Sequence, residues 1–307
     1  MSFFSLLAAL LLEHLYPLVN RIQLYAHFTR YADFLERHFN AGQSRHGMIA
    51  WMLAVVPPVA AIAVAYYVLY HVSPLLGWVL NAAVLYATMG FKYFSNTAGG
   101  IGEALRAQDL GRARSLLGGW RERPADELEA GEIARVTIEQ TLAWGHRQIF
   151  AVLLWFVVLG AAGAVLYRLA SILTHRWGEL ERSDAGDFGR FAARFFEWFD
   201  WIPVRLSAIG FAVVGDFEDA MYCWRSQAVS WAEPAQGIIL AAGAGALGVK
   251  LGEPLHHAGS LEFRPELGLG DEADPDYIES AVSLIWRALV LWLAVLALLQ
   301  IGQWVGG

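Results

Sequence analysis

The chain has 307 residues, of which 57% are hydrophobic and 17% are charged. Soluble domains contain roughly 45–50% apolar residues, so this composition argues against an ordinary soluble domain and predicts an integral membrane protein. The net charge of -7 at pH 7 argues against a nucleic-acid-binding protein, and the single cysteine, Cys223, excludes an internal disulfide and a multi-cysteine metal site.

The first apolar run, Ser2–Val19, is interrupted by Glu13 and His14. It lacks the basic start and the small-residue cleavage site of a signal peptide, so we expect a retained membrane helix that packs against other helices. A carboxylate in hydrocarbon costs free energy. Glu13 therefore either faces the interior of the helix bundle or marks the end of the span.

The next segment, Asn20–Phe39, places apolar residues at a period close to 3.6 among charged ones. This pattern predicts an amphipathic helix that lies on the membrane surface or against a long loop. Four later runs are long and apolar enough to cross a bilayer at 1.5 Å per residue. They are Met48–Val72, Leu75–Phe91, Phe150–Leu173 and Ser283–Val305. Trp286 and Trp304 bracket the last of these runs, as in an aromatic belt.

A polar stretch separates the second of these runs from the third. Ile101–Trp120 and Glu127–Gln148 are typical of an antiparallel helical pair, with Gly118, Gly119 and Pro124 at the break. We therefore expect an all-α, polytopic membrane protein: one membrane domain over residues 1–307, with a helical-pair insertion at residues 93–148.

The arginines predict the orientation. Residues 20–47 and 92–148 are rich in arginine, whereas His71–Pro74 has no Lys or Arg. Because cytoplasmic loops carry an excess of Lys and Arg, we expect both arginine-rich loops in the cytoplasm and the N-terminus outside.

Two shorter apolar runs follow, Trp201–Val214 and Gly237–Val249. The second contains Gly243, Gly245 and Gly248, which match the dinucleotide pattern G-x-G-x-x-G. No strand is predicted before them, so close helix packing through small residues is the better interpretation. Leu251–Pro275 is rich in Gly, Pro and acidic residues and reads as a loop, and we expect no strands anywhere.

Two groups of charged residues are candidates for chemistry. Asp200 and Arg205 stand at the start of an apolar run, where they either line a cavity or reach the lipid headgroups. Helical spacing predicts one stripe of Glu132, Arg135, Glu139 and His146. That stripe is either an acid–base or metal site or a solvated helix face with ordinary ion pairs.

The adjacent His256 and His257 lack a third spaced ligand, so a loop position is favoured over a metal site. No metal site is expected elsewhere.

Five segments, in order along the chain, resemble the CobD/CbiB family of cobalamin-biosynthesis membrane proteins and its relative, the AmpE family. They are Ala104–Trp120, Glu132–Thr141, Gly163–Leu173, Phe199–Leu206 (FDWIPVRL) and Gly243–Pro254 (GAGALGVKLGEP).

The resemblance implies an adenosylcobinamide-phosphate synthase. Such an enzyme joins the carboxyl group of adenosylcobyric acid to an aminopropanol phosphate with ATP, in the inner membrane of a bacterium. The corrinoid and ATP enter only through the resemblance, because the sequence itself shows no cofactor motif. The candidate catalytic residues are Asp200, Arg205, Glu139 and Glu13, and the expected partners are the lipid bilayer, a corrinoid ligand and other membrane proteins.

The chain also departs from the family pattern. Ala143-Trp144-Gly145-His146 stands where the family has Glu-Asn-x-x-Asp, and Glu233–Gly237 replaces its Ser-Pro-Asn-x-Gly. The stretch LLLEHLYPL around Glu13 is more similar to the AmpE family, which is regarded as a sensor or signalling family. An AmpE-like, non-enzymatic membrane component is therefore the alternative.

Overall fold

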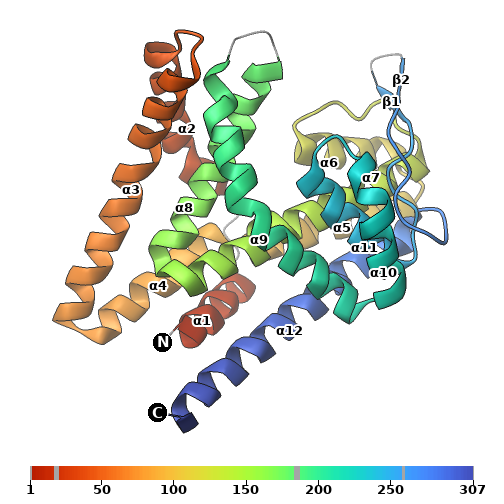
Figure 1. Ribbon diagram of the computed structural model, residues 1–307. Helices are drawn as coiled ribbons and strands as arrows, with labels where there is room; N and C mark the ends of the chain where they lie inside the picture. Colours follow the sequence, from red (N-terminus) through yellow and green to blue (C-terminus); the bar gives the residue numbers. More distant parts are fainter. Residues whose placement is uncertain (1, 17–20, 183–186, 258–259, 307) are drawn as a thin grey trace. The chain divides into compact units, whose positions relative to one another are not determined.

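The computed structural model describes residues 2–16, 21–182, 187–257 and 260–306 (Figure 1). The end of the predicted run Ser2–Val19 and the side chains of His257 and Trp304 lie outside this description. The chain forms two compact units, each built from two stretches of sequence. Unit 1 comprises Met1–Gly90 and Arg147–Trp201, and unit 2 comprises Phe91–His146 and Ile202–Gly307.

All the regular elements in the described part of unit 1 are helices. Its elements are α1 (Ser2–Leu15), α2 (Arg21–Phe39), α3 (Ser44–Val72), α4 (Pro74–Thr88), α8 (Ala151–Arg182), the 3-10 turn η2 (Asp187–Gly189) and the first half of α9 (Arg190–Val214). Helix α2 confirms the predicted amphipathic helix. Arg176 of α8 joins it through a two-bond ion pair with Asp33, with N–O distances of 2.9 and 2.8 Å.

Unit 2 combines helices with one small hairpin. It contains α5 (Phe91–Arg106), α6 (Leu110–Arg121), α7 (Ala130–Gly145), the second half of α9, α10 (Phe217–Gln227), η3 (Ala228–Ser230), α11 (Pro234–Leu247), β1 (Leu255–His257), β2 (Ser260–Glu262) and α12 (Pro275–Gly306). A π-helical turn, η1 (His146–Phe150), follows α7 directly.

Four helices of the described chain are long and apolar enough to cross a membrane. They fall in Ser44–Val72, Pro74–Arg106, Ala130–Gly178 and Pro275–Gly302, which contain or largely overlap the four predicted spans. The prediction of a helical membrane protein is thereby confirmed. The orientation of the loops and the division into one domain with an insertion stay predictions.

The predicted span Phe150–Leu173 is not one regular helix. Gly160 has φ 66° and ψ -155°, which interrupts α8. A Cβ atom on Gly163 would lie 2.2 Å from the carbonyl oxygen of Trp155, so the chain approaches itself closely after the break. Glycine alone adopts both arrangements without strain, because it has no Cβ atom.

The predicted helix Ile101–Trp120 is also two helices. Helix α5 ends at Arg106, and Gln108 has a left-handed φ of 58°. Asp109 then caps α6, where its side chain accepts a 2.9 Å hydrogen bond from the backbone N–H of Arg112. An aspartate in this position satisfies one of the free N–H groups at the start of a helix. Asp109 therefore marks the boundary between α5 and α6, which the spacing of the apolar residues does not indicate.

The expectation of no strands is wrong for the segment after α11. Strands β1 and β2 pair antiparallel, with Leu255 opposite Glu262. The surrounding chain is tied by backbone hydrogen bonds as well, such as Leu251 N to Leu267 O at 2.7 Å. The abundant Gly and Pro of this segment permit tight turns. Because this composition is also typical of a loop, the paired strands were not predicted.

Gly243 and Gly245 of α11 confirm the packing interpretation of the glycine pattern. A Cβ atom on Gly243 would lie 2.6 Å from the side chain of Leu142, and one on Gly245 would lie 2.4 Å from the carbonyl oxygen of Asp219. Gly248 ends the helix with φ 66°. A steric requirement therefore explains the glycine at each position. A dinucleotide site requires a strand before the glycines, and the described chain has none there.

Candidate functional site

One face of α7 carries charged side chains that are buried in unit 2. Glu132, Arg135 and Glu139 are only 9%, 8% and 5% exposed. Their spacing of three and four residues places them on the same helix face. The alternative of a solvated helix face is therefore wrong, since buried charges persist only where partners compensate them.

Glu139 is the most completely paired of these groups. Arg264 donates to both of its carboxylate oxygens, from Nη1 to Oε2 at 2.8 Å and from Nη2 to Oε1 at 2.9 Å. The backbone N–H of Gly252 adds a third bond to Oε1 at 2.9 Å. Such a forked arginine–carboxylate pair is stronger than a single neutral hydrogen bond.

The backbone around Gly252 makes this arrangement possible. Gly252 has φ 76°, and a Cβ atom there would lie 2.0 Å from the carbonyl oxygen of Pro265. Arg264 also donates to the carbonyl oxygens of Gly252 at 2.7 Å and Glu253 at 3.1 Å. Its guanidinium lies 5.4 Å from the ring centroid of Trp231. One arginine thus joins α7, the turn and an aromatic ring.

The other two charges of α7 have partners on the same segment. Arg135 pairs with Glu253 and donates a 3.0 Å hydrogen bond to the carbonyl oxygen of Pro254. Glu132 binds both the backbone N–H and the ring Nδ1 of His256, at 3.1 and 2.9 Å. We call Glu132, Arg135, Glu139, Glu253, His256 and Arg264 the α7 cluster.

A further arginine lies near this cluster. Burial lowers the pKa of Arg121, the charges of Arg264 and Arg123 act in the same direction, and that of Glu139 opposes them. Within the described part of the chain, no direct hydrogen bond or ion pair engages Arg121. A half-buried guanidinium without a direct partner favours an anionic ligand.

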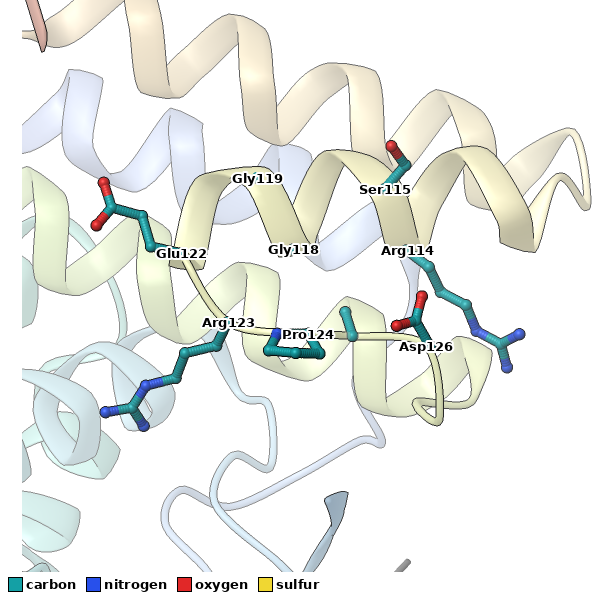
Figure 2. Close-up of a pocket in the computed structure, with 9 residues that line it drawn as sticks. Arg114, Ser115, Gly118, Gly119, Glu122, Arg123, Pro124 and Asp126 are labelled. Atoms are coloured by element: carbon teal, nitrogen blue, oxygen red, sulfur yellow. The ribbon is translucent and has the colours of Figure 1, made fainter. Parts of the chain in front are cut away.

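A hollow of about 340 Å³ lies beside α6, and we call it the α6 hollow (Figure 2). Its lining is Arg114, Ser115, Gly118, Gly119, Glu122, Arg123, Pro124, Ala125 and Asp126. Figure 2 shows Arg114 and Asp126 toward one end and Glu122 with Arg123 toward the other. Two cations and two carboxylates balance, so the hollow alone has no clear preference for an anion.

The predicted site residues fall at separate places. Glu139 belongs to the α7 cluster of unit 2. Arg205, also in unit 2, is half-buried on α9. Glu13 is 3% exposed on α1 of unit 1, as its interior alternative predicts. His146 is buried and lies 2.9 Å from the hydroxyl of Ser207, away from the partners of the other stripe residues.

Asp200 lies in unit 1 and is 2% exposed, which excludes a side chain that reaches the headgroups. The hydroxyl of the fully buried Tyr167 donates to its Oδ1 at 2.8 Å. Trp155 and Phe199 stack beside this region with centroids 3.9 Å apart. Asp200 therefore contributes to the interior of unit 1.

Replacing Tyr167 with Phe is expected to reduce the free energy of unfolding of unit 1 by about 1.5 kcal/mol, because the buried carboxyl group loses one donor while the ring remains. Unfolding the purified protein by titration with a denaturing detergent measures this change in the free energy of unfolding. A Tyr16→Phe variant, at an exposed ring, is the matched control and should leave the value unaltered. Equal stability of Tyr167→Phe and the wild type would contradict the prediction.

Cys223 is buried on α10, and its pKa is raised to about 11, first by burial and then by the nearby Asp219. Alkylation requires the thiolate. We expect the native protein to resist maleimide at pH 8 and the denatured protein to react fully, as mass spectrometry would report. Rapid labelling of folded protein would contradict this.

The partners of the charged residues on α7 could not be predicted from the sequence. Glu253 and Arg264 lie more than 100 positions from Glu139 along the chain, inside a segment that composition assigns to a loop. The left-handed Gly252 and Glu253, with φ 76° and 58°, aim the turn at α7. Among the described residues, no three or more His, Cys, Asp or Glu side chains gather in a way that could hold a metal ion.

The chain is similar in sequence to one protein family over most of its length. The model of the CobD/Cbib protein family matches residues 6–285. The "Cobalamin biosynthesis protein CobD" of Stutzerimonas stutzeri is 38% identical over 298 residues, which cover 96% of each chain. The protein of the same name from Chromobacterium violaceum is 40% identical over 222 residues, covering 72% of this chain and 71% of that one. No solved structure matches.

Proposed function

Because this chain belongs to the CobD/CbiB family of cobalamin-biosynthesis proteins, we propose that it joins adenosylcobyric acid to aminopropanol phosphate. The reaction would form an amide from the corrinoid carboxyl group and the amine, with ATP as the activating substrate. One observation carries the proposal: Glu132–Thr141 and Gly243–Pro254, two of the segments that resemble the family, are joined in the α7 cluster by the contacts of Glu139 with Gly252 and of Arg135 with Glu253.

The charges of unit 2 suit these substrates. The amine substrate and ATP both carry phosphate groups, which guanidinium groups bind well. Arg121 has no direct partner among the described residues, whereas Arg264 is already held by Glu139. We assign phosphate binding to Arg121 and a positioning role to Arg264. Holding two reactants in register can supply much of the rate of a joining reaction.

Growth rescue tests this function. A bacterial strain without its own synthase should regain cobalamin-dependent growth when it expresses this chain. Arg121→Gln should reduce rescue, because a lost charge-assisted contact weakens substrate binding by about 10-fold or more. Arg112→Gln, on the exposed side of α6, is the matched control. Failure of the well-expressed wild-type chain to support growth would reject the proposal.

A second candidate function is that of an accessory or AmpE-like membrane component, and a specific observation favours it. The end of α7, which stands where the family has Glu-Asn-x-x-Asp, is a packing surface. A Cβ atom on Gly145 would lie 2.5 Å from the side chain of Ile285. Trp144 lies against Trp120, with centroids 5.9 Å apart. Tight corrinoid binding without ATP turnover would support this candidate over the synthase.

A further inference from the structure

Glu132 and His256 form a pair in which one partner is buried and the other faces solvent. The Glu132 side chain is 11% exposed, and the His256 side chain is 53% exposed. Ring Nδ1 of His256 lies 2.9 Å from Glu132 Oε1. The pair therefore connects the interior of unit 2 with its surface.

Glu132 is held rigidly in this pair. It is the third residue of α7, and its Oε2 accepts a 2.8 Å hydrogen bond from the backbone N–H of Glu129 in a capping box. Its Oε1 accepts the backbone N–H of His256 at 3.1 Å. These N–H donors and the start of the helix favour the charged carboxylate. Glu132 therefore orients the imidazole.

The contact determines which ring nitrogen carries the hydrogen. A carboxylate only accepts hydrogen bonds, so Nδ1 is the protonated nitrogen of the neutral ring and Nε2 keeps its lone pair. Within the described residues, no hydrogen bond engages Nε2. A buried carboxylate that orients an imidazole with a free outer nitrogen is the arrangement of a general base.

We propose that His256 is the general base of the amide-forming step, oriented by Glu132. This inference rests on the function proposed above, in which ATP activates the corrinoid carboxyl group. In the activating step, the carboxylate oxygen attacks the terminal phosphorus of ATP, ADP leaves, and an acyl phosphate forms. The uncharged substrate amine then attacks the acyl carbon, and its surplus proton passes to His256 Nε2. The carbon–oxygen bond to the phosphoryl group breaks, and orthophosphate leaves with the electron pair.

The neighbouring charges agree with this role. Arg135 and Arg264 are neutralised by Glu253 and Glu139, so neither cation lacks a counter-charge. Strands β1 and β2 hold His256 opposite Leu261 in a paired register. The imidazole is thus presented from hydrogen-bonded backbone, which favours a reproducible position.

The test uses the full-length protein in detergent with adenosylcobyric acid, aminopropanol phosphate and MgATP. His256→Asn keeps a side-chain N–H near Nδ1 for Glu132 but removes Nε2. We expect kcat for amide formation to fall about 100-fold, the usual contribution of a general base, with little change in KM. His38→Asn replaces a surface histidine of α2 whose Nδ1 lies 2.8 Å from the backbone carbonyl oxygen of Phe34, and it should retain full activity.

A second readout separates catalysis from structure. Hydroxylamine attacks acyl phosphates without a base, so His256→Asn should still form the corrinoid hydroxamate at the wild-type rate. An equal loss of amide and hydroxamate would mean that His256 acts in binding or folding, and full amide formation by the variant would make it dispensable. Either result overturns the inference and leaves the proposed function intact. A wild-type protein that forms neither product overturns both.

Discussion

Replacement of Glu139 with Gln is expected to lower the free energy of unfolding of unit 2 by about 3–5 kcal/mol, as for other buried ion pairs that lose one partner. The variant keeps the size of the side chain but leaves the guanidinium of Arg264 without its counter-charge. The Arg264 side chain is 14% exposed and makes two bonds to Glu139, so water cannot readily replace the carboxylate. Unfolding in a detergent titration, followed by tryptophan fluorescence, measures the loss.

Two further variants isolate the pair. Glu139→Gln with Arg264→Met should be less destabilised than the sum of the single changes, with a coupling of about 0.5–3 kcal/mol. Arg106→Gln removes ion pairs to Asp276 and Glu279 that are largely exposed, so it should cost less than about 1 kcal/mol. Additive effects at Glu139 and Arg264 would show that the pair does not hold the turn to α7.

A second large effect is expected at Gly245. Its Cβ position lies 2.4 Å from the carbonyl oxygen of Asp219 and 2.8 Å from the Cα atom of Ala220, so α10 and α11 meet backbone to backbone. Valine would force the helices apart, and we expect a loss of about 3 kcal/mol, at the upper end of overpacking costs. Thermal unfolding by circular dichroism, in detergent, reports it.

Gly99→Ala is the control for this change. Gly99 lies within α5, and nothing stands within 4 Å of its Cβ position. Alanine there should leave the stability unchanged or raise it by up to about 1 kcal/mol, because glycine weakens a helix interior. If Gly245→Val proved as stable as this control, α10 and α11 would not depend on close approach.

The fold was largely predictable, and the reasons are local. Long apolar runs such as Met48–Val72 predict a membrane-spanning helix from their length and composition alone. The break at Gly160 was not predictable, since glycine is also common in regular membrane helices. The hairpin of β1 and β2 was missed because three-residue strands are too short to show a period.

Of the candidate site, the charged residues on α7 could be predicted from the sequence, but their partners could not. Spacing along α7 brought Glu132, Arg135 and Glu139 to one face, and the family resemblance drew attention to the same segment. Their partners depend on the left-handed turn at Gly252, which aims distant residues at α7. No pattern within one segment reports such pairing. Asp200 and Arg205 attracted attention as neighbours in sequence, yet they belong to different units.

The most direct test of the proposed function is amide formation by the purified chain. Protein in detergent is mixed with adenosylcobyric acid, aminopropanol phosphate and MgATP, and mass spectrometry follows the corrinoid. The synthase proposal predicts a product whose mass equals both substrates minus one water, formed only with ATP and consuming one ATP per product. Unchanged corrinoid in the presence of folded, corrinoid-binding protein would contradict it and favour the accessory function.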